Sequence, residues 1–423
     1  MLLFAKGNKN TRINDDLLRE HIFKILHSLG PRSRVLAIPP DFTRYHSEAG
    51  KITQFIYEYY GDKLRAVLPA LGTHFPMTEP EIQKMYGNIP RKLFVKHDWR
   101  NDVITLGEVP SAFVKEVSEG KVNYPWPAQV NKLLKEGNFD LILSVGQVVP
   151  HEVIGMANYN KNVFVGTGGA EGINKSHFLG AAYGLERIMG RKDTPVRKVL
   201  DYASRNFAAD LPLIYIHTVM AKDEAGSLVM KGLYAGDDRE CFDLAADLSL
   251  KVNFQLLDKE LKKVVVFLDP GEFKSTWLGN KSIYRTRMAI ADGGELIVLA
   301  PGLREFGEDK EIDRLIRRYG YLTTPEILKM TEENKELSGN LSAAAHLIHG
   351  SAENRFRIVY CPGHMTQKEV ESVNYNYGLL DEMMKSYDPV KLKDGFNTLP
   401  DGEEIFFISN PALGLWAFKE RFQ

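Results

Sequence analysis

The amino-acid sequence predicts an α/β protein of two domains, each with a mainly parallel sheet, and an active site in the cleft between them. Over about the first 250 residues, short apolar runs alternate with helical patterns. Each apolar run ends in a polar loop, and a second strand–helix–strand pattern follows Lys259. Strands that alternate with helices favour parallel sheets, whose carboxyl ends gather their loops in one crevice.

The chain has 423 residues, which is enough for two or three domains of ordinary size. We expect an N-terminal domain over residues 1–256 and a C-terminal domain over residues 257–403 that closes the cleft. Residues 404–423 form a tail with one predicted strand, and a return of this tail to the N-terminal domain is one alternative.

The composition is typical of a globular protein, with 44% hydrophobic residues, 26% charged residues and a net charge of −1. A near-neutral charge gives no electrostatic reason to expect nucleic acid or an anionic membrane as a partner. No apolar run approaches the ~20 residues that cross a bilayer, and the apolar start is too short for a signal peptide. Cys241 and Cys361 are too few for a disulfide framework, so we expect a cytoplasmic protein.

The first polar loop follows the apolar run Val35–Ile38 and contains Asp41 and Arg44. An arginine in such a loop can bind a carboxylate with its forked guanidinium. The alternative is an aspartate that caps a helix beside a solvated arginine.

The second polar loop follows residues 66–71 and reads Gly72–Thr73–His74. Thr78 and Glu81 have the spacing of a capping box, which predicts a helix directly after this loop. His74 therefore lies in a loop where it can point into the crevice, either as a catalyst or as a hydrogen-bonded structural residue.

The central stretch, residues 150–177, follows a buried-strand pattern over residues 141–145 and contains five glycines. Glycines allow a backbone to approach a ligand closely. The same stretch supplies His151, Lys161 and His177, which together offer a proton carrier, a metal ligand and a covalent anchor. We expect a glycine-rich ligand loop here, with a long helix from Phe178.

The second domain begins with a predicted strand over residues 264–268, a helix over about 275–291 and a strand over 296–300. Lys281 lies in the middle of that predicted helix, where a charged residue is usually solvated. Residues 356–360 and 405–408 are further predicted strands.

Three motifs stand together in this order: Asp41-x-Thr43-Arg44, then Gly72–Thr73–His74, then Pro150–His151 with Lys161 ten residues on and His177 sixteen beyond that. The set resembles the nickel-pincer lactate racemase family of 2-hydroxyacid racemases and epimerases. The resemblance covers essentially the whole chain, including the segment GLYAGDDRECF.

The resemblance implies a nickel-pincer nucleotide, a pyridinium-3,5-bisthiocarboxylic acid mononucleotide with nickel, tethered to Lys161. His177 would be the fourth nickel ligand, completing an S, C, S, N donor set that suits a square-planar metal. His74 and His151 would act as general acid and base on opposite faces of a small 2-hydroxy acid. Reversible hydride transfer would invert C2 through a transient 2-keto acid, and maturation enzymes would supply the cofactor.

Further residues receive roles from the same resemblance. Arg44, with Asp41 as its partner, and Lys281 would bind the substrate, the two cations holding its carboxylate. Thr73, Gly168 and Gly169 would contact the cofactor.

The sequence departs from the family pattern at three places. Asn158–Tyr159–Asn160 stands where the family often has two glycines and an arginine before the lysine, and Phe75 stands where lactate racemases commonly have a basic residue. Residues 277–280 also differ from the polar-aromatic pattern expected before Lys281. These changes leave lactate, a larger aliphatic or aromatic acid and a polyhydroxy acid open as substrates.

Two other classes of function compete with a racemase. A hydrolase or lyase would use His74, His151 and His177 as metal ligands, although no HExxH pair is present and Lys161 would have no role. A non-catalytic protein would close two α/β domains over a carboxylate. A nicotinamide dehydrogenase is disfavoured, because no GxGxxG follows the first strand.

Overall fold

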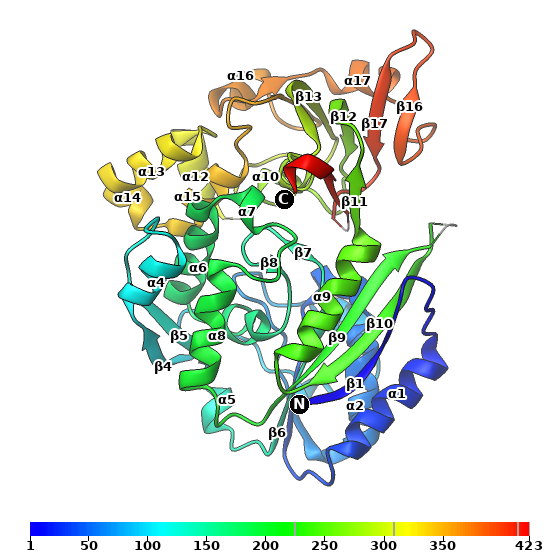
Figure 1. Cartoon of the computed structure of the whole chain (residues 1–423), viewed down its shortest axis with the longest axis vertical. Helices are drawn as coiled ribbons and strands as arrows, with labels where there is room; N and C mark the ends of the chain where they lie inside the picture. The colour runs from blue at the N-terminus through cyan, green and yellow to red at the C-terminus, as the bar shows by residue number, and fades with distance from the viewer. Residues whose placement is uncertain (224–225, 308, 413, 423) are drawn as a thin grey trace. The chain divides into compact units, whose positions relative to one another are not determined.

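The structure is a computed structural model that describes residues 1–223, 226–307, 309–412 and 414–422. It divides into two compact units. The first unit comprises Met1–Leu179 and Ile188–Asn253, and the second comprises Gly180–Arg187 and Phe254–Gln423. Each unit is built around a six-stranded sheet (Figure 1).

The sheet of the first unit has the strand order β1-β10-β9-β6-β2-β3. Its strands, in that order, are Leu2–Gly7, Leu228–Gly236, Leu213–Lys222, Leu141–Gln147, Val35–Ile38 and Leu64–Val67. The four strands from β9 to β3 are parallel, and β10 and β1 continue the sheet in antiparallel fashion. The predicted α/β class with mainly parallel sheets is thus confirmed.

Helices cover both faces of this sheet because each has one apolar stripe. α1 (Asp15–Ser28) starts at Asn14, whose side chain accepts a hydrogen bond from the Leu17 backbone. Its buried residues pack with those of α2 (Ala49–Tyr60) on β2 and β6. α9 (Arg239–Asn253) lies along β9 and β10 (Figure 1).

Beside this sheet the first unit carries a smaller antiparallel pair, β4 (Val103–Val109) with β5 (Trp126–Asn131). α4 (Ser111–Val117) and α8 (Pro195–Phe207) pack against this part of the unit. The short helices α3 (Glu79–Tyr86) and α5 (Leu133–Glu136) and the 3-10 turns η2 (Gly61–Lys63) and η3 (Arg91–Leu93) lie in the connections. Most of the short helix α7 (Leu185–Ile188) belongs to the second unit.

The central stretch is more regular than the predicted glycine-rich loop. β7 (Pro150–His151) and β8 (Gly155–Met156) form a tight antiparallel pair, and η4 (Asn162–Gly166) is a π-helical turn. α6 (Ala170–Tyr183) begins eight residues before the predicted start at Phe178. The prediction failed because glycines at 168, 169 and 172 were taken as loop, whereas they allow the turn and the helix to pack closely.

The sheet of the second unit has the order β15-β14-β13-β12-β17-β16. Its strands, in that order, are Asn376–Tyr377, Arg357–Pro362, Ile290–Ala300, Leu261–Phe267, Glu404–Ile408 and Gly395–Thr398. All are parallel to their neighbours except β16. The predicted strand–helix–strand unit is therefore present as β12 and β13.

The C-terminal residues belong to this second unit. β17 lies between β12 and β16, and β18 (Leu415–Phe418) pairs with β11 (Phe254–Leu257). The apolar run of β17 extends the buried parallel sheet of the second unit. This placement differs from the alternative in which the tail returns to the N-terminal domain. The division also falls before Phe254 instead of after residue 256.

The helix predicted over residues 275–291 is two short helices, α10 (Thr276–Gly279) and α11 (Lys281–Tyr284). Asn280 separates them, because its buried side chain accepts a hydrogen bond of 2.8 Å from the Tyr360 hydroxyl. Lys281 is consequently the first residue of α11 and not a mid-helix residue.

The other helices of the second unit are α12 (Lys310–Tyr319), α13 (Thr324–Glu333), α14 (Lys335–Ser338), α15 (Leu341–His349), α16 (Gln367–Ser372), α17 (Leu380–Ser386) and the 3-10 turn η5 (Lys419–Arg421). None of the helices in the described ranges has the length and apolar character that a membrane span requires.

Candidate active site

Asp41 and His74 form a hydrogen-bonded pair beyond the ends of β2 and β3. Asp41 caps the 3-10 turn η1 (Phe42–Ser47), and its Oδ1 accepts hydrogen bonds from the Thr43 amide at 3.0 Å and from the Thr43 hydroxyl. Its Oδ2 lies 2.5 Å from Nδ1 of His74. The predicted capping aspartate and the predicted loop histidine are thus joined in one unit.

The proton of His74 is placed by this pair. Burial alone would raise the pKa of Asp41, but the charge and hydrogen bond of His74 and the hydrogen bonds of Thr43 outweigh it and lower the pKa to about 2. Asp41 is therefore a carboxylate at neutral pH and accepts the proton of Nδ1. Because Nδ1 carries a proton, the neutral form of His74 has its lone pair on Nε2, and this is the form that can act as a general base.

His151 has the opposite arrangement. It is 7% exposed in the β7–β8 pair, and its Nδ1 accepts a hydrogen bond of 3.1 Å from the Val153 amide. Burial lowers its pKa well below the ordinary value; Glu152 opposes that shift, while Lys161 adds to it. His151 is thus a neutral imidazole whose proton is on Nε2, so it presents a hydrogen-bond donor to a ligand.

Lys161 directly precedes the π-helical turn η4 and is partly exposed. Burial, together with the positive charge of Arg44, lowers its pKa to about 8. An ordinary lysine has a pKa near 10.4, so Lys161 has far more free amine at neutral pH. The free amine is the nucleophilic form, as a covalent anchor requires.

The segment before Lys161 has backbone angles that are typical of glycine, although it contains no glycine. Asn158 and Tyr159 have φ angles of 68° and 60°, in the left-handed region that glycine adopts without strain. This departure from the family pattern therefore keeps the backbone geometry that two glycines would allow. Strain of this kind costs about 1–3 kcal/mol per residue and persists only where neighbouring contacts enforce it.

Asn162 connects the start of η4 to the sheet through side-chain hydrogen bonds. Its side-chain amide donates hydrogen bonds of 3.0 Å to the Ile38 carbonyl and 3.0 Å to the Ser144 hydroxyl. We expect Asn162→Ala to lower the free energy of unfolding by about 2–4 kcal/mol, because two buried acceptors lose their donor. Urea unfolding measures this loss. Ser144→Ala removes only one of the two bonds, so a loss as large as that of Asn162→Ala would contradict the assignment.

His177 lies on α6 and is oriented by the helix backbone. Its Nδ1 donates a hydrogen bond of 2.7 Å to the Ile173 carbonyl, which leaves the Nε2 lone pair available. Burial lowers its pKa, although the bond to Ile173 opposes the shift. A neutral imidazole with one nitrogen fixed by a carbonyl is the usual form of a histidine metal ligand.

The predicted residues of the first unit act on one another electrostatically. Lys161 lowers the pKa of both His151 and His177, and Glu152 raises both. His74 also lowers the pKa of His177. These groups therefore gather at the same place in the fold. Sequence reasoning missed Glu152, whose only signal is its position directly after His151.

The comparisons with known proteins agree with this geometry. Residues 23–184 match the family model of the lactate racemase N-terminal domain. The matched range contains His74, His151, Lys161 and His177. The match shows a lactate racemase N-terminal domain over these residues. The predicted resemblance to the lactate racemase family is thus confirmed for this part of the chain.

Two solved structures share the fold. A protein from Thermotoga maritima is 24% identical, with a TM-score of 0.80, and the match covers 96% of this chain and 98% of that chain. The lactate racemase apoprotein from Thermoanaerobacterium thermosaccharolyticum is 16% identical, with a TM-score of 0.71, and the match covers 97% of this chain and 94% of that chain. A search of curated proteins found no match.

The glycines predicted to contact the cofactor are explained first by packing. A Cβ on Gly168 would lie 1.9 Å from the Phe164 carbonyl oxygen, and one on Gly169 would lie 2.5 Å from the side-chain oxygen of Gln129. Gly72 has a φ of 57°, which places the following Thr73 and His74 beyond the end of β3. Cofactor contacts of Thr73, Gly168 and Gly169 stay predictions.

The predicted substrate-binding residues are differently placed than the sequence suggested. Arg44 donates to the carbonyl and the hydroxyl of Thr43, each at 3.3 Å, whereas Asp41 is paired with His74. Lys281 lies in the second unit, with Nζ 5.6 Å from the ring centre of Phe273. Binding of a substrate carboxylate by Arg44 and Lys281 stays a prediction.

Gln147, at the end of β6, is a further residue that sequence reasoning missed. It is 5% exposed, and neither atom of its carboxamide has a hydrogen-bond partner in the described part of the chain. Its strand neighbour Thr218 donates to the Ser47 carbonyl at the end of η1, so Gln147 faces the side of the sheet that carries η1. A glutamine within the apolar run of β6 was the available signal for a ligand contact.

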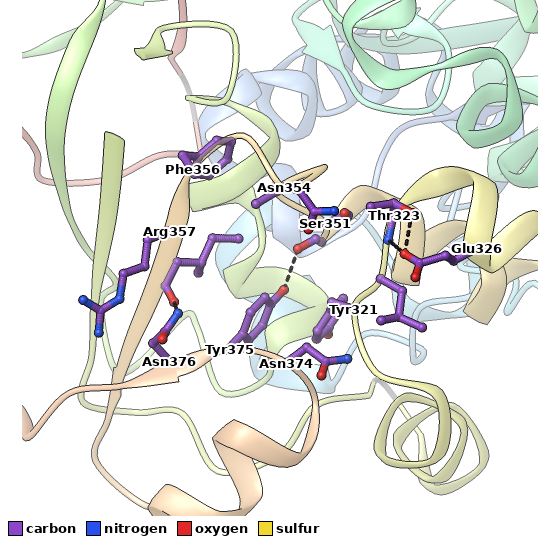
Figure 2. Close-up of a pocket in the computed structure, with 14 residues that line it drawn as sticks. Tyr321, Thr323, Glu326, Ser351, Asn354, Phe356, Arg357, Asn374, Tyr375 and Asn376 are labelled. Atoms are coloured by element: carbon purple, nitrogen blue, oxygen red, sulfur yellow. Dashed lines mark hydrogen bonds between the residues drawn. The ribbon is translucent and has the colours of Figure 1, made fainter. Parts of the chain in front are cut away.

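The cavity in Figure 2 is a separate feature of the second unit. It has a volume of about 300 Å³ and lies at the amino end of β14, around Arg357. Its polar groups bind one another: the Thr323 amide donates to Glu326 at 2.9 Å, and the Tyr375 hydroxyl donates to the Gly350 carbonyl at 2.9 Å. None of the predicted site residues lines it, so we do not place the active site there.

Proposed function

We propose that this protein inverts the C2 centre of a small 2-hydroxy acid, using a nickel-pincer nucleotide attached to Lys161. The observation that carries the proposal is the opposite proton states of two histidines near one reactive lysine. Nε2 of His74 is an acceptor and Nε2 of His151 is a donor, by their hydrogen bonds to Asp41 and Val153. When C2 is inverted through a 2-keto acid, a base has to take up the hydroxyl proton and return it, while a hydrogen-bond donor holds the same oxygen.

The side chains fit the proposed cofactor. A metal held by two sulfurs and a carbon of the nucleotide needs one nitrogen from the protein, and Nε2 of His177 is available for it. Lys161 offers the free amine for the covalent tether. Within the described ranges no three histidine, cysteine, aspartate or glutamate side chains are grouped to hold a metal ion. The histidine-liganded hydrolase or lyase, which needs such a group, therefore gains no support.

When bound, the cofactor would supply a reversible hydride acceptor, and the residues of the chain would handle the proton and the charge. His74 would accept the hydroxyl proton while Asp41 stabilises the resulting imidazolium. His151 would donate a hydrogen bond from Nε2–H to the substrate oxygen from the other side, and the imidazolium of His74 would return the proton to that oxygen. Arg44, whose guanidinium is near Thr43, would neutralise the substrate carboxylate.

The substrate proposed here has a side chain larger than that of lactate. Phe75, directly after His74, is 74% exposed, although large apolar side chains are usually buried. An exposed ring next to the proposed base favours contact with an apolar or aromatic substituent at C2. We therefore expect larger 2-hydroxy acids to react faster than lactate, and Phe75→Lys to reduce that preference.

The test is to produce the protein with the cofactor-maturation enzymes and to measure its mass and metal content. We expect an added mass that maps to Lys161, with about one nickel per chain, and neither in Lys161→Arg. A substrate with deuterium at C2 should then be inverted with the deuterium retained, because the proposed reaction transfers this hydrogen. An unmodified Lys161 without nickel, under conditions that load another family member, would contradict the proposal and favour the carboxylate-binding alternative.

A further inference from the structure

The segment that leads to Lys161 is held by a buried arginine from a distant helix. Arg197 of α8 is fully buried. Its Nη2 donates a hydrogen bond of 2.7 Å to the Met156 carbonyl, and Nη1 and Nη2 each lie 3.3 Å from the Asn158 carbonyl. Nη1 also donates to Oδ1 of Asn160. Every described hydrogen bond of this guanidinium therefore ends on residues 156–160.

A second layer of polar contacts fixes the same segment. The amide of Asn160 donates to Asp201 at 2.7 Å and to Ser204 at 3.2 Å. Asp201 in turn accepts a hydrogen bond of 2.9 Å from Arg239 of α9. Asn160 is thus held on one side by Arg197 and on the other by Asp201, which orients its side chain fully.

Aromatic contacts hold Tyr159, the strained residue between Asn158 and Asn160. The ring of Tyr159 is stacked on Phe242 with a centroid distance of 5.3 Å, and the guanidinium of Arg197 lies 4.4 Å from the Phe242 ring centre. Two consecutive left-handed residues are unfavourable by themselves, so such contacts must enforce them. The guanidinium reaches the Met156 and Asn158 carbonyls and also the Asn160 side chain beyond the turn, which a point charge on a flexible stem cannot do at once.

We propose that Arg197 is a positioning residue for Lys161: its guanidinium holds the left-handed Asn158–Tyr159 turn so that the Lys161 amine faces the site. The inference rests on the proposed function for the purpose of that lysine, but the placement of the amine is measurable without any cofactor. A merely structural arginine would stabilise the unit without a selective effect on Lys161. The properties of that one amine therefore distinguish the two roles.

The experiment is a pH profile of lysine acetylation, measured by peptide mass spectrometry on the full chain made without maturation enzymes. Lys63, an exposed lysine of the same molecule at the end of η2, serves as the internal reference. Arg197→Lys keeps the positive charge but lacks the fork, so its effect separates positioning from charge. Arg239→Lys is the matched control, because Arg239 shares Asp201 but makes no described contact with residues 156–160.

In Arg197→Lys we expect the apparent pKa of Lys161 to rise by about 1 or more, because a loosened segment lets water reach the ammonium. At pH 8 the acetylation rate of Lys161 relative to Lys63 should fall about 5-fold or more. Arg239→Lys should change neither. An unchanged Lys161 profile in a folded Arg197→Lys variant would overturn the proposal.

If Arg197→Lys does not fold, Asn160→Leu is the second variant, since it removes one acceptor of the guanidinium and leaves the backbone acceptors. It should shift the Lys161 profile in the same direction by a smaller amount, and no shift would overturn the proposal. The wild-type loading experiment is independent of this result. A chain that never acquires nickel fails the proposed function, even where Arg197 controls the amine.

Discussion

Replacing Asp41 with asparagine is expected to lower the turnover of the loaded enzyme by about 10⁴-fold, the loss seen when the carboxylate behind a catalytic histidine becomes an amide. Oδ1 of Asp41 is held by two donors from Thr43, so the oxygen of an asparagine would stay there. Its NH₂ group would then face Nδ1 of His74. The imidazole would have to accept at Nδ1 and carry its proton on Nε2, which is the wrong state for a base.

The measurement is the rate of C2 inversion, normalised to the nickel bound per chain. Normalisation matters because Asp41 also contributes to the charge around Lys161. Thr43→Val is the matched control: it removes one hydrogen bond to Asp41 but keeps the Thr43 backbone donor and the carboxylate, so we expect a loss of less than about 10-fold. Equal losses in the two variants would show that Asp41 acts only through the shape of η1.

The sequence predicted the sheets well because their signal is local. Each central strand is a short apolar run buried on both faces, as β2 and β6 are, and such runs predict parallel strands without any tertiary information. The polar loops after β2 and β3 were placed correctly for the same reason. Because parallel strands align their carboxyl ends, Asp41 and His74 meet although 33 residues separate them.

The parts that the sequence did not predict depend on contacts between distant segments. The partner of Asp41 was expected to be Arg44, three residues away, but the ring of His74 lies closer in space. The left-handed turn before Lys161 contains no glycine from which it could have been predicted. Hydrogen bonds from Arg197, on another helix, hold this turn instead. Asn280 broke a predicted helix for a similar reason, since Tyr360 binds its side chain.

The position of α6 shows how a sound local rule gives a wrong boundary. Glycines usually mark loops, yet Gly172 lies within the helix, where a Cβ would approach the Pro127 carbonyl oxygen to 3.1 Å. The helix therefore includes His177, and its carbonyl at Ile173 fixes the imidazole. A residue predicted to lie in a flexible loop is instead held rigidly, which is what a metal ligand requires.

Acid is expected to destabilise the first unit from about pH 6.5 downward, and His217 should account for a large share. His217 is fully buried on β9, where its Nδ1 accepts from the Asn158 amide at 3.0 Å. Burial lowers its pKa to about 3, and the charge of Arg197 adds to the shift. The unfolded chain binds a proton near pH 6.5, whereas the folded chain does not until about pH 3.

Between these two values the unfolded state holds more protons, so the free energy of unfolding falls by about 1.4 kcal/mol for each pH unit of acidification. The contribution is fully present above pH 6.5 and is lost progressively toward pH 3. Burial also lowers the pKa of His151 and His177, which steepens the same limb. Urea unfolding at pH 6.5, 5.5 and 4.5 measures the slope.

His217→Phe keeps an aromatic ring beside Tyr159, Tyr215 and Phe242 and removes the titrating group. We expect its stability slope to be shallower than that of wild type by about 1.4 kcal/mol per pH unit. Tyr215→Phe alters the same aromatic cluster without removing an imidazole and should keep the wild-type slope. Because the comparison uses slopes, a constant loss from the missing bond to Asn158 does not affect it. A His217→Phe slope equal to that of wild type would show that the folded protein takes up the proton at this site.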